Sequence, residues 1–497
     1  MNVLLLSMPD SFEHMPTSAV RMPNGALVSL AGNVDPHHRV AVADLILVQG
    51  RVRETVIRLV NEFAPDVVGL STMTFQRKTA FKIVELIRSL RPSVRFVVGG
   101  YDPSLATEAY TDPACGIDFI VRGEGELTFR ELLRAIENST DYAAIDGLSY
   151  RTDTGFAHNP DRALSTLEGS DIRLPARRSR VLRGYTLLGR QSDVIETSRG
   201  CTFDCSFCSI IEMRGRNFNK FSFDRVLADI RDARDHGARS IFIVDDNLTL
   251  NIKRFEGLCN AIIEAGLNTI DYTVQAMTSA IADHGETLAP LMRKAGFRYV
   301  FLGIENVVES DLSFLHASSK NTKHENGKRA GNAALTAIEH LHRNKMYVLG
   351  GLIVGNPEDT RESIEANLTF ARRFIDWPYI QHPTPYPRTP MTKQLAALGL
   401  ITSDRLEEYD GTTSVVACEN VSGEEIEFMR WRAERWIKAR HWWTLVKHDP
   451  LFMARNIKRI FDFNFRGSTV KTFLGLEDER LAFSRYRGMR AAERNYV

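Results

Sequence analysis

The stretch Arg199-Gly200-Cys201-Thr202-Phe203-Asp204-Cys205-Ser206-Phe207-Cys208 decides how the rest of this 497-residue chain is interpreted. Its three cysteines follow the spacing C-x3-C-x2-C in one short loop, directly after a strand-like run. A cubane iron–sulfur cluster has four irons and normally takes four thiolates. Three thiolates leave one iron without a protein ligand, and an open metal position is where chemistry takes place. The spacing therefore predicts an iron–sulfur cluster with one open iron.

Two other interpretations of these cysteines are a zinc knuckle and three unrelated thiols. Zinc usually takes further ligands from a second Cys/His pair, and no such pair follows the loop. The remaining cysteines, Cys115, Cys259 and Cys418, are isolated in the sequence. Six cysteines in this pattern do not make a disulfide framework, and they suit a reducing compartment.

The ten residues resemble the signature of the radical S-adenosylmethionine (SAM) enzymes. The resemblance implies that Cys201, Cys205 and Cys208 hold a [4Fe–4S] cluster. It also implies that SAM chelates the open iron through its amino and carboxylate groups.

Strands and helices alternate over residues 191–395, on both sides of the cysteines. Repeated βα units without a Gly-rich dinucleotide turn predict a partial (β/α)6 barrel of the TIM type, with its site at the carboxyl ends of the strands. The run Gly351-Leu352-Ile353-Val354-Gly355-Asn356-Pro357-Glu358 matches the G-x-I-x-G-x-x-E motif on the adenine side of SAM in the resembled family. Together these features predict the SAM contacts Phe207, Asp245, Asp246, Asn247, Gln275, Glu305, Gly351, Ile353, Gly355 and Glu358.

Asp245 and Asp246 are equally good candidates to receive the SAM amino group, and a capping role is the alternative for any single acid. Arg214 and Arg216, just past the cysteines, are predicted to steady SAM or an anionic substrate, or else are solvated arginines. The segment 382–390 resembles the P-x-P-G-T-P segment of cobalamin-dependent members, with an arginine in place of the glycine. That resemblance implies that His382 and Tyr386 face the substrate, whereas a plain domain boundary is the alternative.

Residues 1–145 alternate apolar strands with helices, which predicts a parallel, doubly wound Rossmann-like sheet. Such sheets bind ligands at the carboxyl ends of their strands. A Gly-Gly turn after the fourth predicted strand and an R-G-E-G-E turn after the fifth resemble the cobalamin-binding domain that precedes many radical SAM domains. The implied corrinoid contacts are Ser7, Met8, Ser71, Thr72, Met73, Gly99, Gly100, Tyr101, Arg122, Gly123 and Glu124.

The D-x-H-x-x-G motif, whose histidine ligates cobalt in other cobalamin proteins, is absent after the first strand. Radical SAM relatives commonly lack it too and bind the corrinoid without a histidine below the metal. One alternative is a degenerate domain that only supports the barrel. A flavin or nucleotide site is disfavoured because no G-x-G-x-x-G follows the first strand.

The remaining segments are a connector and a carboxy-terminal region. Residues 146–190 are predicted to connect the two domains and to include a small hairpin. Residues 396–497 are predicted to be mainly helical, with four tryptophans at 431, 436, 442 and 443 and a local net charge of +9 from Arg430 to Val497. A packed helical cap, an acidic-substrate pocket and a membrane-surface face are the three interpretations of that region.

Composition and charge exclude only a few classes of protein. A formal net charge of +1 gives no global attraction to nucleic acid or membrane. The amino terminus lacks the basic and apolar regions of a signal peptide, and no stretch reaches the ~18 apolar residues of a membrane span. We therefore expect a cytoplasmic protein, with peripheral membrane contact as the open alternative.

The resemblance implies a cobalamin-dependent radical SAM C-methyltransferase that acts on an unactivated carbon through a 5′-deoxyadenosyl radical and methylcobalamin. The alternatives are a cyclase, oxidase or rearrangement enzyme without methyl transfer, and a corrinoid- or redox-sensing regulator. The expected partners are a small-molecule or lipid-like substrate and an external electron donor of the flavodoxin or ferredoxin type.

Overall fold

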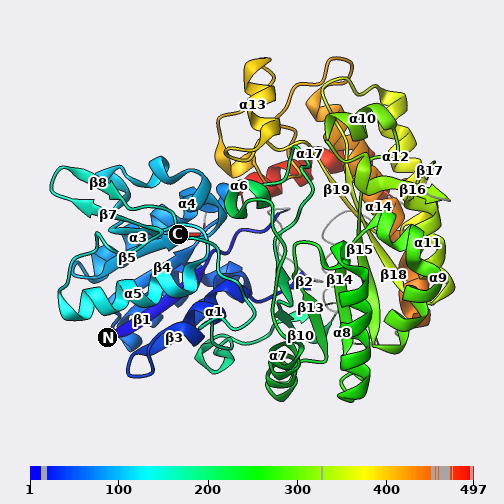
Figure 1. The fold of residues 1–497 in the computed structure, drawn as a ribbon. Coiled ribbons are helices and arrows are strands. Elements are labelled where there is room, and N and C mark those ends of the chain that lie inside the picture. The colour runs from blue at the N-terminus through cyan, green and yellow to red at the C-terminus, as the bar shows by residue number, and fades with distance from the viewer. Residues whose placement is uncertain are drawn as a thin grey trace.

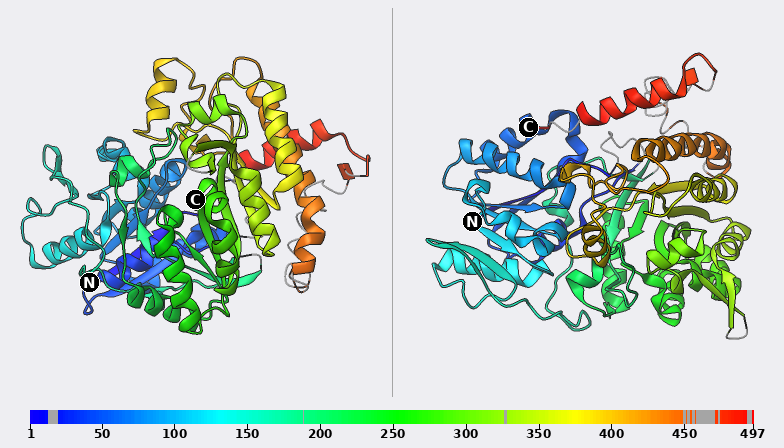
Figure 2. Two further views of the ribbon diagram at one scale, coloured as in Figure 1. Left: turned by 45° about the vertical axis from the view of Figure 1, so that its right-hand side comes forward. Right: turned by 90° about the horizontal axis from the view of Figure 1, so that it is seen from above.

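The computed structural model describes residues 1–12, 20–187, 189–325, 328–448, 451, 454, 457, 471–472, 474–492 and 496–497. Two sheets, each flanked by helices, form two lobes that lie side by side (Figure 1). The carboxy-terminal helices run along one side of both lobes (Figure 2). The predicted order of a Rossmann-like domain, a partial barrel and a helical region is therefore confirmed.

The first sheet has seven strands in the order β3-β1-β4-β5-β6-β7-β8. The side chains of β1 point alternately to the two faces, so Leu4 and Leu6 pack against one layer of helices and Val3 and Leu5 against the other. This double burial is the pattern of a doubly wound sheet. The strands are β1 (Asn2–Ser7), β3 (Arg39–Asp44), β4 (Val67–Ser71), β5 (Arg95–Gly99), β6 (Phe119–Val121), β7 (Leu148–Thr152) and β8 (Gly155–His158).

Four longer helices cover the two faces of this sheet. Helices α2 (Val52–Phe63) and α3 (Arg77–Leu90) lie on one face, and α1 (Gly25–Asn33) and α5 (Gly125–Asn138) lie on the other. The short helix α4 (Tyr101–Leu105) follows β5 directly. The starts of α1, α4 and α5 therefore gather near the carboxyl ends of the parallel strands, where a ligand is expected.

The second sheet has eight strands in the order β19-β18-β15-β14-β13-β10-β9-β2. Six of them are parallel, which confirms the partial (β/α)6 barrel, and two short antiparallel strands, β9 (Thr186–Leu187) and β2 (Val20–Arg21), extend one edge. The parallel strands are β10 (Arg190–Ile195), β13 (Ser240–Ile243), β14 (Asp271–Met277), β15 (Phe297–Glu305), β18 (Tyr347–Ile353) and β19 (Trp377–Gln381). Their covering helices are α7 (Phe223–Asp235), α8 (Ile252–Glu264), α9 (Thr278–Lys294), α11 (Ala334–Arg343) and α12 (Arg361–Phe374).

Shorter elements surround the carboxyl ends of these strands. They are β11 (Ser198–Arg199), β12 (Asn219–Lys220), α6 (Ile210–Arg214), α10 (Glu309–Phe314), the hairpin β16 (Thr322–Glu325) and β17 (Lys328–Asn332), and α13 (Pro390–Ala397).

The segment predicted as a connector contributes to both sheets. Its hairpin, β7 and β8, pairs antiparallel with β6 and so extends the first sheet past residue 145. Strand β9 then adds to the second sheet. The edge strand of a sheet presents unpaired backbone groups, so a hairpin from a later segment can pair with it. A domain boundary drawn on composition alone does not anticipate this pairing.

The carboxy-terminal region is helical, as predicted, with α14 (Gly423–His448) and α17 (Glu479–Ala492). Trp431 is buried and packs against Phe428 and Phe483, while the side chains of Trp442 and Trp443 lie outside the described residues. Several arginines of these helices pair with acids, among them Arg432 with Glu479 at 2.9 Å. These contacts favour the packed helical cap over a membrane-surface face.

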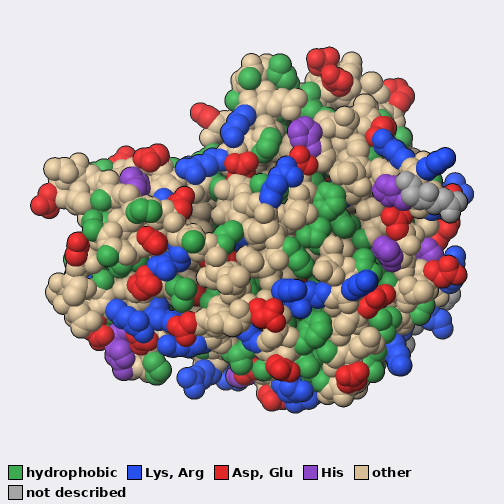
Figure 3. Space-filling view, in the orientation of Figure 1, with side chains coloured by type: hydrophobic (Ala, Val, Ile, Leu, Met, Phe, Trp, Pro, Cys, Tyr) green, Lys and Arg blue, Asp and Glu red, His purple; other side chains and the backbone are tan. Residues whose placement is uncertain are grey.

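Among the residues that the structure describes, no helix combines the length and apolar character needed to cross a membrane. On the face shown in Figure 3, basic and acidic side chains are interspersed over both lobes.

Candidate functional site

The cysteine loop is held at its amino-terminal end by a glycine and an aspartate. Gly200 has a φ of +96°, and a Cβ there would lie 2.2 Å from Oδ1 of Asn217, so only glycine fits this turn. The Asp246 carboxylate accepts a hydrogen bond from the Gly200 backbone N–H at 2.7 Å and another from Arg214 Nη1 at 2.8 Å. The end of β13 thereby fixes the start of the loop.

The middle of the loop is fixed by backbone bonds to distant segments. The Ser206 N–H donates to the Leu315 carbonyl at 3.0 Å, and the Met391 N–H donates to the Ser206 carbonyl at 2.8 Å. The segments around Leu315 and Met391 thereby hold the middle of the loop.

The chemistry and placement of the three thiols fit an iron–sulfur cluster. All are free cysteines, and burial raises the pKa of Cys205 and raises that of Cys208 to about 12. Buried thiols become thiolates readily only when a metal ligates them. Among the described residues, the one His/Cys/Asp/Glu group compact enough for a single ion lies elsewhere, which favours a multi-iron cluster for these cysteines. Cys201 also has an outer contact, because Asn247 Nδ2 lies 3.7 Å from its Sγ.

A buried lysine beside the cysteines is not among the site residues that the sequence predicts. Lys320 forms an ion pair with Glu305, and its Nζ lies 5.4 Å from the centre of the Phe207 ring. Burial alone would lower the pKa of Lys320, but the Glu305 carboxylate raises it. The ammonium therefore stays charged beside Cys205 and Cys208. Glu305 itself has a φ of +60° at an irregularity in β15, a strained conformation typical of functional sites.

The two adjacent aspartates have different environments. Asp245 is fully buried and accepts hydrogen bonds from the Thr197 N–H at 2.6 Å, the Thr197 hydroxyl at 2.5 Å and the Ser198 hydroxyl at 2.6 Å. Burial raises its pKa to about 6. Its oxygens are therefore occupied by the strand that leads into the cysteine loop, whereas Asp246 lines a cavity.

The predicted adenine-side motif closes a turn after β18. Gly355 has a φ of +89°, and Asp359 Oδ2 accepts hydrogen bonds from the N–H groups of Gly355 at 2.8 Å and Asn356 at 2.9 Å. Glu358 is exposed, so the carboxylate that organises this turn is the neighbouring Asp359, which the sequence pattern does not single out. A Cβ at Gly351 would lie 2.9 Å from the Phe301 ring.

The other predicted SAM and substrate residues occupy two regions. Phe207, Ile353 and Tyr386 belong to one apolar cluster, so the cysteine loop, β18 and the proline-rich segment meet there. His382 is buried with Nδ1 3.0 Å from the Val354 carbonyl, and burial lowers its pKa to about 3. Gln275 lies half-buried in β14, opposite Phe301.

A cavity of about 400 Å³ lies between the two lobes and is lined by both of them. Its volume is within the range of ligand pockets. From the first domain it receives predicted corrinoid residues at the ends of β4, β5 and β6, and from the barrel it receives Arg214 and Asp246. The predicted residues that line it are Ser71, Thr72, Met73, Gly99, Gly100, Tyr101, Gly123 and Glu124.

Glycines and the start of α1 shape the first-domain wall of this cavity. Gly100 has a φ of +104°, and a Cβ at Gly123 would enter open space. Asn24 caps α1 by accepting from the Leu27 N–H, and its Nδ2 donates to Ser71 Oγ at 3.1 Å. Glycines at the carboxyl ends of parallel strands leave room for a large ligand such as a corrinoid at this wall. The role of Asn24 is not evident from the sequence, because no predicted strand ends there.

Three predicted corrinoid residues and Arg216 lie outside the cavity. The Ser7 hydroxyl donates to Asp44 Oδ1 at 2.7 Å, Met8 is buried in the core of the first domain, and Arg122 pairs with Asp161 at 2.6 Å. Arg216 is exposed and pairs with Asp204 at 3.0 Å. Strand ends set the general location of a site, whereas side-chain direction decides which residues reach it.

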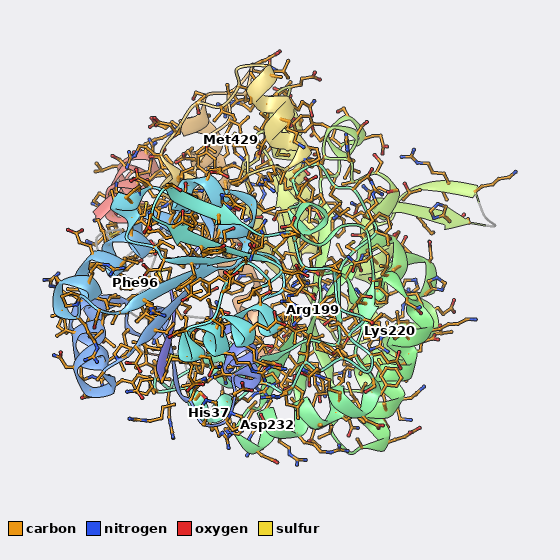
Figure 4. The ribbon with its side chains drawn as sticks, turned by 60° about the vertical axis from the view of Figure 1, so that its left-hand side comes forward. His37, Phe96, Arg199, Lys220, Asp232 and Met429 are labelled. Atoms are coloured by element: carbon orange, nitrogen blue, oxygen red, sulfur yellow. The ribbon has the colours of Figure 1, made fainter. Side chains whose placement is uncertain are left out.

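Arg199 connects the cysteine loop to the first domain. Its guanidinium, only 5% exposed, lies 2.6 Å from Glu126 Oε1, 2.8 Å from Glu196 Oε2 and 3.3 Å from Glu124 Oε1. Burial alone would raise the pKa of Glu126, but the Arg199 guanidinium lowers it to about 2. Figure 4 shows Arg199 between the elements of the two lobes. Arg199 and Glu126 both line the cavity.

Comparison with known families assigns both lobes. Residues 18–133 match the B12 binding domain, and residues 195–371 match the radical SAM superfamily. The chain is thus a radical SAM enzyme with a B12-binding domain, as the sequence predicts.

Several known proteins have sequences similar to this chain. An uncharacterized methyltransferase of Pyrococcus horikoshii is 28% identical over 86% of this chain and 90% of its own length. The hopanoid C-3 methylase of Methylococcus capsulatus is 26% identical over 67% of this chain and 61% of its own length. The anaerobic magnesium-protoporphyrin IX monomethyl ester cyclase of Synechocystis sp. is 27% identical over 65% of this chain and 64% of its own length. The chain thus spans under two thirds of the latter two relatives.

Two solved structures share the fold. The radical SAM methyltransferase TsrM from Kitasatospora setae, with cobalamin and a [4Fe–4S] cluster bound, has a TM-score of 0.66 and 19% identity over 88% of each chain. The cobalamin-dependent radical SAM enzyme OxsB has a TM-score of 0.66 and 17% identity over 99% of this chain and 71% of its own.

Proposed function

We propose that this protein is a cobalamin-dependent radical SAM C-methyltransferase acting on a small molecule. The observation that carries the proposal is the single cavity shared by the strand ends of the B12-binding domain and the loop side of the barrel. A cavity with this double lining allows a corrinoid and the cluster region to serve one substrate.

When bound, the cluster supplies the electron that cleaves SAM to a 5′-deoxyadenosyl radical, and the corrinoid carries the methyl group. Cys201, Cys205 and Cys208 would hold the cluster, and the glycine-lined wall of the cavity would hold the corrinoid. Asp246 aligns the cysteine loop with Arg214, which places a cation at the cavity wall. Phe207, Ile353 and Tyr386 exclude water beside the loop.

The same residues suggest how SAM is oriented. Asp246 is half-buried at the cavity, so we assign it the SAM amino group in preference to Asp245, whose oxygens accept three hydrogen bonds from Thr197 and Ser198. The turn Gly355–Asp359 would receive the adenine side. The external electron donor, the lipid-like character of the substrate and peripheral membrane contact stay predictions.

The test is metal and product analysis of anaerobically purified protein produced with cobalamin available. We expect about four irons and one cobalt per chain. With SAM and a chemical reductant, we expect both 5′-deoxyadenosine and S-adenosylhomocysteine. Cys201→Ala should abolish the first product and limit the second to about one equivalent per corrinoid, because the methyl group would no longer be consumed.

Each other outcome selects another function. 5′-Deoxyadenosine without S-adenosylhomocysteine would contradict methyl transfer and favour a cyclase, oxidase or rearrangement enzyme. Iron without cobalt would exclude a role for the cavity as a corrinoid site. Both cofactors without either product would favour the sensing regulator.

A further inference from the structure

Three side chains with metal-ligating atoms meet at the end of the first domain opposite the cavity. His37 and His38 immediately precede β3, and Glu137 lies in the last turn of α5. Their ligand atoms all lie within 4.8 Å of one another. Helix α5 begins at the cavity and is roughly 20 Å long, so this group is remote from the cobalamin and cluster regions. Figure 4 places His37 at the edge of the molecule, far from Arg199.

The distances within the group suit a small divalent cation. Glu137 Oε2 lies 2.9 Å from His37 Nε2 and 3.8 Å from His38 Nε2. Zinc bonds of about 2.0–2.1 Å in a tetrahedron require neighbouring ligands to be roughly 3.3 Å apart. The two distances lie on either side of that value, so small side-chain rotations would bring both imidazoles to the ion.

His38 provides an independent indication of a ligand. Its side chain is fully buried, and its Nε2 has no hydrogen-bond partner among the described residues. The Met1 amino nitrogen lies 3.2 Å from Nδ1, which leaves Nε2 as the nitrogen directed at Glu137. A buried polar atom without a partner is costly, and a cation between His38 and Glu137 would satisfy it.

The surrounding charges favour a cation as well. Helices α1 and α5 both end beside this group, and the carboxyl end of a helix attracts positive charge. Two nearby cations, Arg134 and Arg173, lie 2.9 Å and 3.6 Å from Asp35, which offsets one of their two charges.

We propose that His37, His38 and Glu137 bind a divalent cation of the Zn²⁺ type, with water in the fourth position. The ion would join the α1–β3 turn to the end of α5. It would therefore stabilise the B12-binding domain from the side away from its cavity. This inference does not depend on methyl transfer.

The test is isothermal titration of ZnCl2 into the cluster- and cobalamin-loaded protein, in which the three cluster cysteines are already occupied. We expect one zinc site per chain whose affinity falls about tenfold or more in His37→Gln and in Glu137→Gln. Both replaced side chains are partly exposed, so the variants should fold, which circular dichroism checks. His324→Gln is the matched control, because His324 also pairs with a carboxylate, Asp283 at 3.3 Å, but without a third ligand.

A second measurement does not rely on variants. Zinc should protect His37 from diethyl pyrocarbonate, as read by peptide mass spectrometry, while His324 stays reactive. Unchanged zinc affinity in both variants, or equal modification of His37 with and without zinc, would mean an adventitious ion only and would overturn the proposal. Absence of any zinc binding to the wild type would overturn it too.

Discussion

Asp245 and Asp246 differ by one position, yet the structure gives them separate tasks. Residues that follow one another at a strand end point in opposite directions, so Asp245 is buried against Thr197 and Ser198 whereas Asp246 lines the cavity. Two adjacent aspartates in a sequence indicate a site but do not show which of the two side chains reaches it.

Asp245 should make stability depend on pH. Its folded-state pKa is raised to about 6 from an ordinary value of 3.8, so its contribution to stability is present at low pH and is lost as the pH rises through about 6. Between pH 5 and 7.5 we expect the wild type to lose about 1 kcal/mol relative to Asp245→Asn. The midpoints of urea unfolding of both proteins at the two pH values measure this loss. Midpoints that shift equally with pH in wild type and Asp245→Asn would contradict the raised pKa.

Lys320 should set the potential of the cluster. Its buried ammonium lies near Cys205 and Cys208, and a nearby cation stabilises the more negative, reduced cluster. Lys320→Met should lower the midpoint potential by roughly tens of millivolts, as measured by a redox titration followed by electron paramagnetic resonance. Lys328→Met, at an exposed position of β17, is the control. Equal potentials in wild type and Lys320→Met would refute the assignment.

At the scale of elements, the turn after β18 depends on contact with α14. A Cβ at Gly355 would lie 2.9 Å from Ile426 Cγ2, so the carboxy-terminal helix packs directly over the end of a barrel strand. Helix α14 also contacts β19 through Arg430, whose Nε donates to the Ile380 carbonyl at 2.8 Å. The helical cap thus supports the predicted adenine-side turn.

Gly355→Ala should therefore destabilise the protein more than its backbone conformation alone explains. A non-glycine residue in the left-handed region costs about 1–2 kcal/mol, and the contact with Ile426 adds to this. Gly399→Ala is matched for positive φ (+67°) but has no atom within 4 Å of the added Cβ. Thermal unfolding should show a larger loss for Gly355→Ala, and equal losses would argue against the contact with α14.

At the scale of the whole molecule, the two lobes are joined by ionic and apolar contacts of residues far apart in sequence. Arg199 pairs with Glu124 and Glu126 of the first domain. Tyr496 and Val497 pack against the core of that domain. These contacts hold the cavity between the lobes in one shape.

Arg199→Gln should weaken this junction, because it leaves buried carboxylates without a counter-ion, at a cost of about 3–5 kcal/mol. We expect faster proteolysis between the lobes and weaker cobalamin retention. Arg216→Gln, at an exposed position just after α6, is the control and should change neither. Cobalamin retention and proteolysis equal to wild type would show that the lobes are held together without Arg199.

The sequence by itself determined the cluster cysteines, the order of the domains and most strand ends, because spacing and alternation are local properties. Eight of the eleven predicted corrinoid residues line the cavity for this reason. Only the tertiary structure decided that Asn24, Arg199, Lys320 and Asp359 contact the predicted site residues, that Ser7, Met8 and Arg122 lie outside the cavity, and that His382 is buried. The physical reason is that burial, side-chain direction and ion pairing arise between segments as distant as Glu126 and Arg199, which no local pattern in the sequence relates.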